Sequence, residues 1–201
     1  MRGQVLSRFL GDLGKAVSGL MKPIVLIGFR GSGKTAAGKG LARKMGLPFY
    51  DSDQWIVRLL GRTIGEFVEA SGWEAFRALE KTTVQEIFRQ KPGVVSLGGG
   101  AVLDPENRAL IREKGMVVWL KAEVPTLLKR MESDPTSKNN RPALSDWDWE
   151  KETKTILAER TPIYEETAHT VLDTEGKSLE EVVEELHALV KNVKRSSFWV
   201  C

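Results

Sequence analysis

The sequence predicts an α/β protein with a five-stranded parallel sheet and helices on both faces. Short apolar runs alternate with longer segments of helical periodicity along the 201 residues. The first run, Ile24–Ile27, leads directly into a glycine-rich loop and then into a helix. A chain of this length fits one domain with a sizeable core. We therefore expect a single α/β domain over residues 21–201, preceded by an extension over residues 1–20.

The first half of the chain supplies three strands and the helices between them. After the glycine-rich loop, small and apolar residues recur at helical spacing: Ala36, Ala37, Leu41, Ala42 and Met45. A short apolar strand is expected at 47–50. Helical stretches follow, separated at Gly61 and again at Ser71-Gly72. The later one runs from 73 to about 90 and carries Phe76, Leu79, Val84, Ile87 and Phe88. A third strand is expected at 94–97.

The second half continues the alternation, which favours a parallel sheet. Strands are expected at 116–120 and 170–173, and helices at 105–114, 124–131, 149–166 and 179–193. The polar segment 132–148 is too long for an ordinary connection, which indicates a functional loop or lid.

Residues 1–20 carry an apolar stripe near helical period. A transit peptide and a membrane-surface helix are two interpretations of this stripe. Serine is sparse there and Asp12 is acidic, which argues against the transit peptide. We favour a frayed extension or a start assigned too early, with Met21 as a natural start.

Residues 28–35 match G-x-x-x-x-G-K-[ST], the phosphate-binding Walker A loop. The strand before it and the helix after it are in the order that phosphate binding needs. The expected nucleotide-binding residues are Gly31, Ser32, Gly33, Lys34, Thr35 and Ala36. Lys34 would reach the β- and γ-phosphates, and the Thr35 hydroxyl would bind Mg²⁺. A nucleoside triphosphate is therefore the expected ligand.

Composition excludes several other classes of protein. There are 30 basic and 27 acidic residues, too balanced for a nucleic-acid footprint. No apolar run approaches the roughly 20 residues of a membrane span. The one cysteine, Cys201, allows no disulfide within this sequence, which fits a reducing compartment. We expect neither nucleic acid nor membrane as a partner, and a cytoplasmic location.

Two carboxylates follow the second expected strand, at the edge where ligands gather in open α/β sheets. One of them, Asp51 or Asp53, would help to hold Mg²⁺, and the other would orient or deprotonate an acceptor hydroxyl. A turn with two capping aspartates is the alternative. The third strand ends without an aspartate, so Asp51 is the available metal carboxylate.

Glycines and arginines follow at other strand ends and in helices. Gly98, Gly99 and Gly100 come directly after a strand and would let a ligand approach the backbone. Arg77 and Arg160 lie in helical segments, where a solvated side chain or a surface ion pair is the ordinary interpretation. Arg141 lies in the polar segment beside a proline and would swing over phosphates. His169 and His187 are expected to be structural.

Taken together, these residues resemble the shikimate kinase family over about residues 22–195. The ordered motifs are the Walker A loop, Asp51-Ser52-Asp53, Phe76-Arg77 with Glu80, Gly98-Gly99-Gly100, Arg141-Pro142-Ala143-Leu144, and Glu159-Arg160 with Pro162 and Tyr164. Val57 and Trp73 stand where acidic residues are frequent in the family. Three features look like those of the family's type II enzymes: the long lid, the segment from Asp51 to Trp55, and Trp73 with Phe76-Arg77.

The resemblance implies a P-loop kinase with strand order 2-3-1-4-5, as in nucleoside monophosphate kinases. It implies MgATP-dependent phosphorylation of the shikimate 3-hydroxyl on the route to chorismate and aromatic amino acids, by a monomer. Mobile segments are expected at about 53–80 for the substrate and 132–148 for the lid. Arg130 resembles the family's adenine-stacking arginine, and residues 173–178 would flank the base on the other side.

The residues suit that reaction chemically. Arg77 and Arg160 would bind the substrate carboxylate, and Asp53 would hold the attacking hydroxyl. Lys34, Mg²⁺ and Arg141 would neutralise charge on the transferred phosphoryl group. One rival is another small-molecule kinase of the same fold, acting on gluconate or a nucleoside monophosphate. The other is a nucleotide-binding regulator that has lost catalysis.

Overall fold

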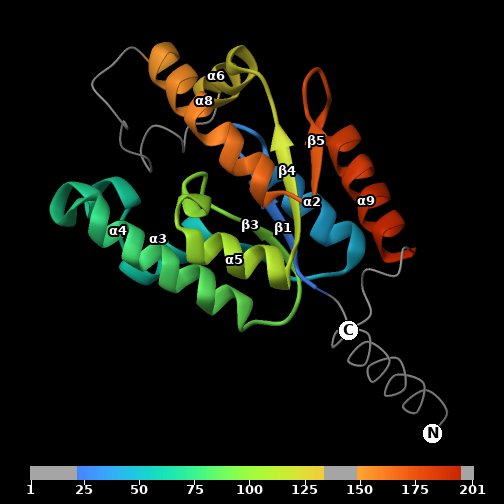
Figure 1. The fold of residues 1–201 in the computed structure, drawn as a ribbon, viewed down its shortest axis with the longest axis horizontal. Helices are drawn as coiled ribbons and strands as arrows, with labels where there is room; N and C mark the ends of the chain where they lie inside the picture. The colour runs from blue at the N-terminus through green and yellow to red at the C-terminus, as the bar shows by residue number, and fades with distance from the viewer. Residues whose placement is uncertain (1–21, 134–148, 196–201) are drawn as a thin grey trace, which may run out of the picture.

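Five parallel strands form one sheet in the computed structural model, which describes residues 22–133 and 149–195 (Figure 1). The spatial order is β2-β3-β1-β4-β5, which confirms the expected order. The strands are β1 (Ile24–Ile27), β2 (Phe49–Asp51), β3 (Val94–Ser96), β4 (Met116–Lys121) and β5 (Thr170–Asp173). In the centre of the sheet, Val25 of β1 is in register with Val95 of β3 and with Val117 of β4.

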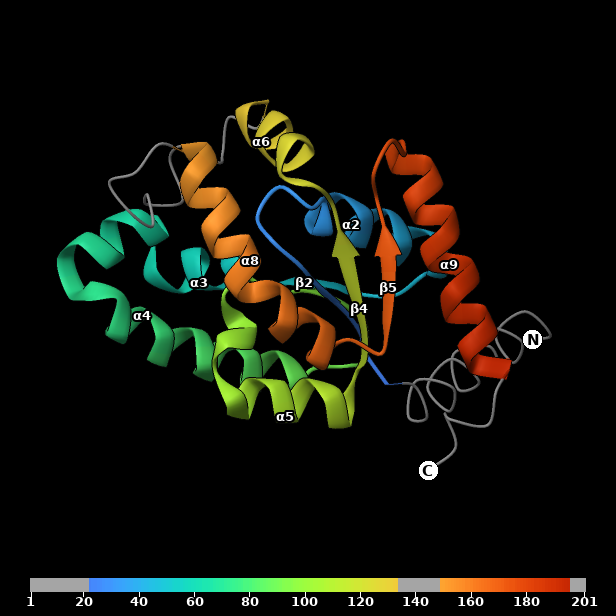
Figure 2. The same cartoon turned by 45° about the horizontal axis from the view of Figure 1, so that its top comes forward.

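Helices cover both faces of this sheet (Figures 1 and 2). Those described are α2 (Lys34–Met45), α3 (Ser52–Leu60), α4 (Ile64–Phe88), the short 3₁₀ helix η1 (Ala101–Leu103), α5 (Pro105–Lys114), α6 (Val124–Glu132), α8 (Trp149–Thr167) and α9 (Leu179–Arg195). Helices α2 and α9 pack together on one face, and α4, α5 and α8 cover the other. None of these helices has the length and apolar character that a membrane span requires.

The alternation of side chains along β1 produces the two halves of the core. Ile24 and Leu26 point to the face of α2 and α9, where they join a buried cluster with Leu41 and Leu186. Val25 and Ile27 point to the opposite face, into a cluster that includes Tyr164 of α8. Because both faces of the sheet are covered, β1 reads in the sequence as an unbroken apolar run.

One predicted boundary needs correction, and one interruption of a helix is confirmed. The second strand begins at Phe49 rather than at residue 47, because the backbone N–H of Leu47 donates to the Ala42 carbonyl and completes the end of α2. The break expected at residues 71–72 is confirmed as a kink within α4, where Gly72 has a non-helical φ of 80° and ψ of 166°. The helix continues on both sides of this left-handed residue, which a side chain would strain.

The carboxyl ends of the strands meet at one edge of the sheet, where ligands bind in folds of this kind. The Walker A loop follows β1, Asp51 ends β2, and the three glycines follow β3. Helix α6 begins shortly after β4, and the loop that leads to α9 follows β5. Residues 1–20 lie outside the described residues, as does the expected lid at 132–148 beyond residue 133, including Arg141.

Candidate active site

The backbone of the Walker A loop is shaped by two left-handed glycines. Gly31 and Gly33 have φ of 80° and 87°, a region that other residues rarely adopt. A Cβ on Gly31 would lie 2.8 Å from the Leu127 carbonyl oxygen of α6, so the loop also packs too closely for a side chain. Gly33 is the N-cap of α2, and the N–H groups of the first turn are therefore available to an anion.

Lys34 lies across the base of this loop and is buried. Its ammonium group donates to the carbonyl oxygens of Gly28 at 2.9 Å and Phe29 at 2.8 Å. These bonds hold the cation inside the loop, where the positive end of α2 adds to its field.

Thr35 and Asp51 come together across the edge of the sheet. The Thr35 hydroxyl donates to Asp51 Oδ2 at 2.7 Å, while Asp51 Oδ1 accepts from the backbone N–H of Gln54 and caps α3. A hydroxyl beside a buried carboxylate is the oxygen donor set that Mg²⁺ takes from a protein when phosphates and water supply the other ligands. The residues therefore fit the expected magnesium site.

A cavity of about 350 Å³ opens above the Walker A loop. Its walls include the predicted nucleotide-binding residues from Gly31 to Ala36, together with Arg130, Thr174, Lys177, Ser178, Leu179 and Val182. The loop expected to flank the base therefore does lie at this cavity. Leu179 and Val182, in the first turns of α9, were not anticipated as lining residues.

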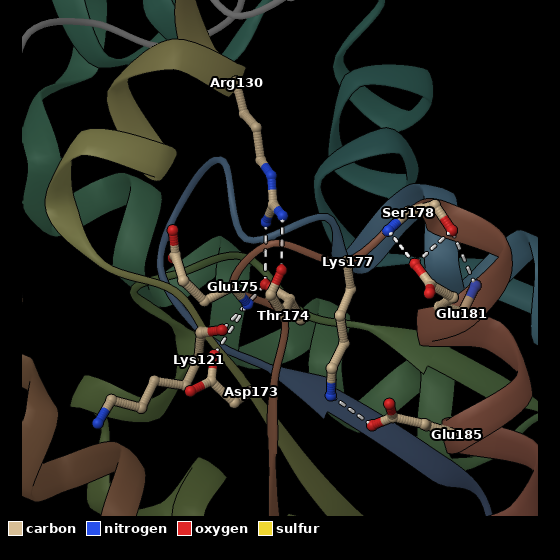
Figure 3. Close-up of polar contacts among 9 residues, drawn as sticks. All are labelled: Lys121, Arg130, Asp173, Thr174, Glu175, Lys177, Ser178, Glu181 and Glu185. Atoms are coloured by element: carbon tan, nitrogen blue, oxygen red, sulfur yellow. Dashed lines mark hydrogen bonds and ion pairs between the residues drawn. The ribbon is translucent and has the colours of Figure 1, made fainter.

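Arg130 lines this cavity and is held in place by Thr174 (Figure 3). Its guanidinium donates to the hydroxyl and to the carbonyl oxygen of Thr174, both at 2.9 Å. The Thr174 hydroxyl in turn donates to the Lys121 carbonyl oxygen at the end of β4. This chain of bonds holds the plane of the arginine at the cavity wall.

The loop after β5 is anchored at both ends. The Glu175 carboxylate accepts from the Thr126 hydroxyl of α6 at 2.5 Å, which is the main reason that its pKa is lowered. At the other end, Ser178 and Glu181 form a reciprocal capping arrangement at the start of α9. The Lys177 side chain reaches down to Glu185 at 2.6 Å (Figure 3).

A second, smaller pocket of about 70 Å³ lies on the other side of the Walker A loop. Five of its lining residues are ionisable: Arg30, Asp53, Arg77, Glu80 and Arg160. The others are Ile64, Trp73, Phe76 and the glycine triplet Gly98, Gly99 and Gly100. Every residue predicted from the sequence for the acceptor lines this pocket.

The glycine triplet forms the floor, and its neighbours leave no room for side chains. A Cβ on Gly98 would lie 2.5 Å from Asp53 Oδ1, and one on Gly100 would lie 2.4 Å from a guanidinium nitrogen of Arg77. The Gly98 N–H donates to the buried Ser52 hydroxyl at 2.8 Å, which fastens the triplet to the start of α3. The glycines therefore let both charged side chains reach the floor of the pocket.

Helix α8 closes the pocket from the opposite side. The Arg160 guanidinium donates to the Gly99 carbonyl oxygen at 3.2 Å, and the Tyr164 hydroxyl donates to the same oxygen at 2.6 Å. Burial raises the pKa of Tyr164 to about 12, so its hydroxyl keeps its proton and remains a donor. Arg160 is thus no surface arginine but part of the wall.

Comparison with known proteins identifies the family of this chain. The family model described as shikimate kinase matches residues 30–191. The chain belongs to the shikimate kinase family. The resemblance predicted from the sequence is confirmed at this level.

Individual members of the family show how far the similarity extends. "Shikimate kinase 2" of Enterobacter sp. strain 638 is 42% identical over 164 residues, which is 82% of this chain and 92% of that one. A solved shikimate kinase from Acinetobacter baumannii, in complex with shikimate, superposes with a TM-score of 0.82 at 32% identity, covering 90% of this chain and 99% of that one. A gluconokinase from Sinorhizobium meliloti, at 20% identity and a TM-score of 0.52, shares the fold alone.

Glu80 is the site residue whose chemistry the sequence did not reveal. It is 2% exposed and binds Arg77 at 2.5 Å through Oε2. Burial raises the pKa of the Glu80 carboxyl to about 7, because desolvation outweighs the attraction of Arg77 and Arg160, and the Asp53 carboxylate adds repulsion. In the sequence Glu80 appears only as part of the Phe76-Arg77 motif, and the fold shows that it forms a buried pair with Arg77.

This raised pKa predicts how stability depends on pH. Between about pH 4.5 and 7 the folded state holds a proton on Glu80 that the unfolded state has lost, so stability falls as pH rises through this window. The full cost, on the order of 3 kcal/mol, is present above pH 7. Denaturant unfolding of wild type and Glu80→Gln across pH 4.5–8 should show this fall in the wild type alone. The exposed Glu74→Gln on the same helix serves as the control, and parallel wild-type and Glu80→Gln curves would contradict the assignment.

Proposed function

We propose that this chain transfers the γ-phosphoryl group of ATP to the 3-hydroxyl of shikimate, giving shikimate 3-phosphate and ADP for aromatic amino acid biosynthesis. The observation that carries the proposal is the pairing of two pockets across the Walker A loop. A Cβ on Gly99 would lie only 3.3 Å from the Gly28 carbonyl oxygen, so the floor of the small pocket packs on the backbone of the phosphate loop. An acceptor in the small pocket would therefore lie next to the γ-phosphate.

The charges of the small pocket suit a small carboxylate with hydroxyl groups. Arg77 and Arg160 offer two planar guanidinium groups, which bind carboxylates through paired hydrogen bonds. Glu80 holds Arg77 in place, and because burial raises the pKa of its carboxyl to about 7, it carries less negative charge than an exposed glutamate at that pH. The backbone around Gly99 would contact the ring without steric hindrance.

The reacting end of the acceptor would lie at Asp53. Its carboxylate would accept the hydrogen bond of the 3-hydroxyl and orient or deprotonate it. Lys34 and the N–H groups of the first turn of α2 would stabilise the charge on the phosphoryl oxygens. When bound through Thr35 and Asp51, Mg²⁺ would neutralise the β- and γ-phosphates.

The remaining assignments follow the same plan. Arg130 would stack on the adenine, opposite the loop at 173–178, and Arg141 would approach the phosphates from the segment 132–148. We further propose that the segment 53–80, which carries Arg77, is mobile and adjusts when the substrate binds. We also propose a cytoplasmic monomer with residues 1–20 outside the catalytic domain.

A coupled assay of ADP release tests the function directly. With shikimate, ADP should form at a rate that saturates with both substrates, and with gluconate or a nucleoside monophosphate it should remain near background. Comparable turnover of another acceptor would favour the rival kinase. ATP binding with no turnover of any acceptor would favour the regulator.

Recognition of the carboxylate can be tested with two conservative substitutions. Arg77→Lys and Arg160→Lys keep the charge but lose the planar fork, so each should lower kcat/KM for shikimate by about 10- to 150-fold, with ATP binding nearly intact. Shikimate methyl ester lacks the anion and should be a poor substrate for the wild type. It should also respond much less to the two substitutions. Equal turnover of ester and acid would remove carboxylate recognition from the proposal.

A further inference from the structure

A buried ion pair joins the Walker A loop to the start of α8. Arg30 Nη2 and Glu152 Oε1 lie 2.6 Å apart, and their side chains are only 10% and 2% exposed. The two residues are 122 positions apart in the sequence. Neither was predicted as a functional residue, because the arginine stands at a variable position of the Walker A pattern and the glutamate begins an ordinary amphipathic helix.

Stability alone gives a weak reason for such a pair. Removing two charges from water is costly, and a buried ion pair can often be replaced by apolar residues with no loss of stability. The neighbourhood already offers an apolar alternative, since Phe29, Leu127 and Met131 form a buried cluster with Ile156 and Leu157 of α8. Stability therefore does not explain why a pair of charges lies in this position, and we look for a chemical role.

The position of Arg30 indicates that role. Arg30 lines the small pocket together with Arg77 and Arg160, whereas the next residue, Gly31, lines the nucleotide cavity. Arg30 thus lies at the junction of the small pocket and the nucleotide cavity. Its guanidinium carbon lies 5.6 Å from the centroid of the Phe29 ring, and that of Arg160 lies 5.8 Å from the same centroid. The two cations are therefore gathered around one buried ring.

Helix α8 holds both of these arginines. Its first turn supplies Glu152 to Arg30, and about two turns later it supplies Arg160, which binds the Gly99 carbonyl oxygen. One helix therefore contacts the Walker A loop and the glycine floor at the same time.

We propose that Glu152 is a positioning residue for phosphoryl transfer, which orients the Arg30 guanidinium so that it binds the transferred phosphoryl group on the acceptor side. The inference rests on the function proposed above. The product carries more negative charge than the acceptor, and a further guanidinium at the junction offsets that increase. A guanidinium has five donors in a planar fork, so a carboxylate that binds one edge leaves the group able to bind an oxyanion at another edge.

Two variants separate positioning from stability. Glu152→Gln keeps the shape but removes the charge, and the double variant Arg30→Met with Glu152→Leu replaces the pair by apolar side chains. The exposed Glu150→Gln in the same turn is the matched control. For each protein we would measure the thermal midpoint, the KM for ATP, kcat/KM for shikimate, and inhibition by added shikimate 3-phosphate.

The double variant gives the decisive result. Its thermal midpoint should be close to that of the wild type, while kcat/KM for shikimate falls by about 10-fold or more, as for a lost charge-assisted contact. Inhibition by shikimate 3-phosphate should weaken by a similar factor, and the KM for ATP should stay within about twofold. Glu152→Gln should show the same kinetic pattern to a smaller degree, and Glu150→Gln should match the wild type.

Other outcomes overturn the inference. A double variant with wild-type kinetics and wild-type stability would show that the pair has no role in transfer. If the double variant unfolds, Glu152→Gln carries the test, and unchanged inhibition by the product in that variant would overturn positioning. A wild type that does not phosphorylate shikimate would contradict the proposed function itself and remove the basis of this inference with it.

Discussion

Asp53→Asn should lower kcat with shikimate by about 10²- to 10⁴-fold, the usual range for a lost general base, and leave ATP binding nearly unchanged. The reason is the position of Asp53 in the first turn of α3, where it lines the small pocket and lies against Gly98. Asparagine has the same shape and can still accept a hydrogen bond, but it cannot take a proton. Steady-state kinetics with each substrate varied in turn, together with titration of a non-hydrolysable ATP analogue, would measure both effects.

The size of the loss distinguishes the two roles proposed for this carboxylate. If Asp53 only orients the hydroxyl, Asp53→Asn should keep much of the activity, and its pH profile should match that of the wild type. If it is a base, the acidic limb of the wild-type kcat profile should disappear in the variant. Glu69→Gln, an exposed change in α4, serves as the control. An effect confined to the KM for ATP would remove Asp53 from the acceptor site.

Much of the fold follows from local sequence patterns. The residues before and after the Walker A loop carry a buried-strand run and a helical repeat, and the structure has β1 and α2 there. The strand at 170–173 and the helix at 105–114 were predicted to the residue, because a proline or glycine borders the helix and polar residues border the strand. Strand order came from the family resemblance, since nothing local specifies which strands become neighbours.

Boundaries failed where a tertiary bond competed with local propensity. Leu47 is as apolar as the strand that follows it, and its hydrogen bond to the end of α2 is invisible in the sequence. The interruption at Gly72, by contrast, was predicted correctly, as was the helix that follows it, in which Phe76 and Val84 are buried in two separate clusters. The energy of those contacts outweighs the cost of one non-helical residue.

The residues of the candidate site could be predicted from the sequence where they follow a strand or lie in a glycine-rich segment. Lys34, Asp51, Asp53 and Gly99 all lie at the carboxyl edge, as their positions after strands indicated. Arg77 and Arg160 seemed ordinary helical arginines, and only the family resemblance singled them out. The raised pKa of Glu80 and the pair of Arg30 with Glu152 depend on burial and on long-range pairing, which a single sequence does not encode in any local pattern.

Lys34→Ala should lower turnover by about 10²-fold or more, because the phosphoryl group loses a cation that is already in place before the reaction begins. Lys34 is buried against the carbonyl oxygens of Gly28 and Phe29, so little reorganisation is needed when phosphates replace or share these partners. The same bonds mean that alanine leaves two carbonyl groups without their donor. A loss of thermal stability is therefore expected beside the loss of turnover, and the two must be separated.

Lys34→Met separates them, because methionine keeps most of the buried aliphatic volume and removes only the charge and its hydrogen bonds. Both variants should be slow, and the methionine variant should unfold at the higher temperature of the two. Lys39→Ala, in the same helix but outside both pockets, should match the wild type in turnover. If Lys34→Met were folded and turned over at a near-normal rate, the cation would be dispensable. The charge on the phosphoryl group would then have to be neutralised by the amides of the loop, by the metal and by the arginines of the acceptor pocket alone.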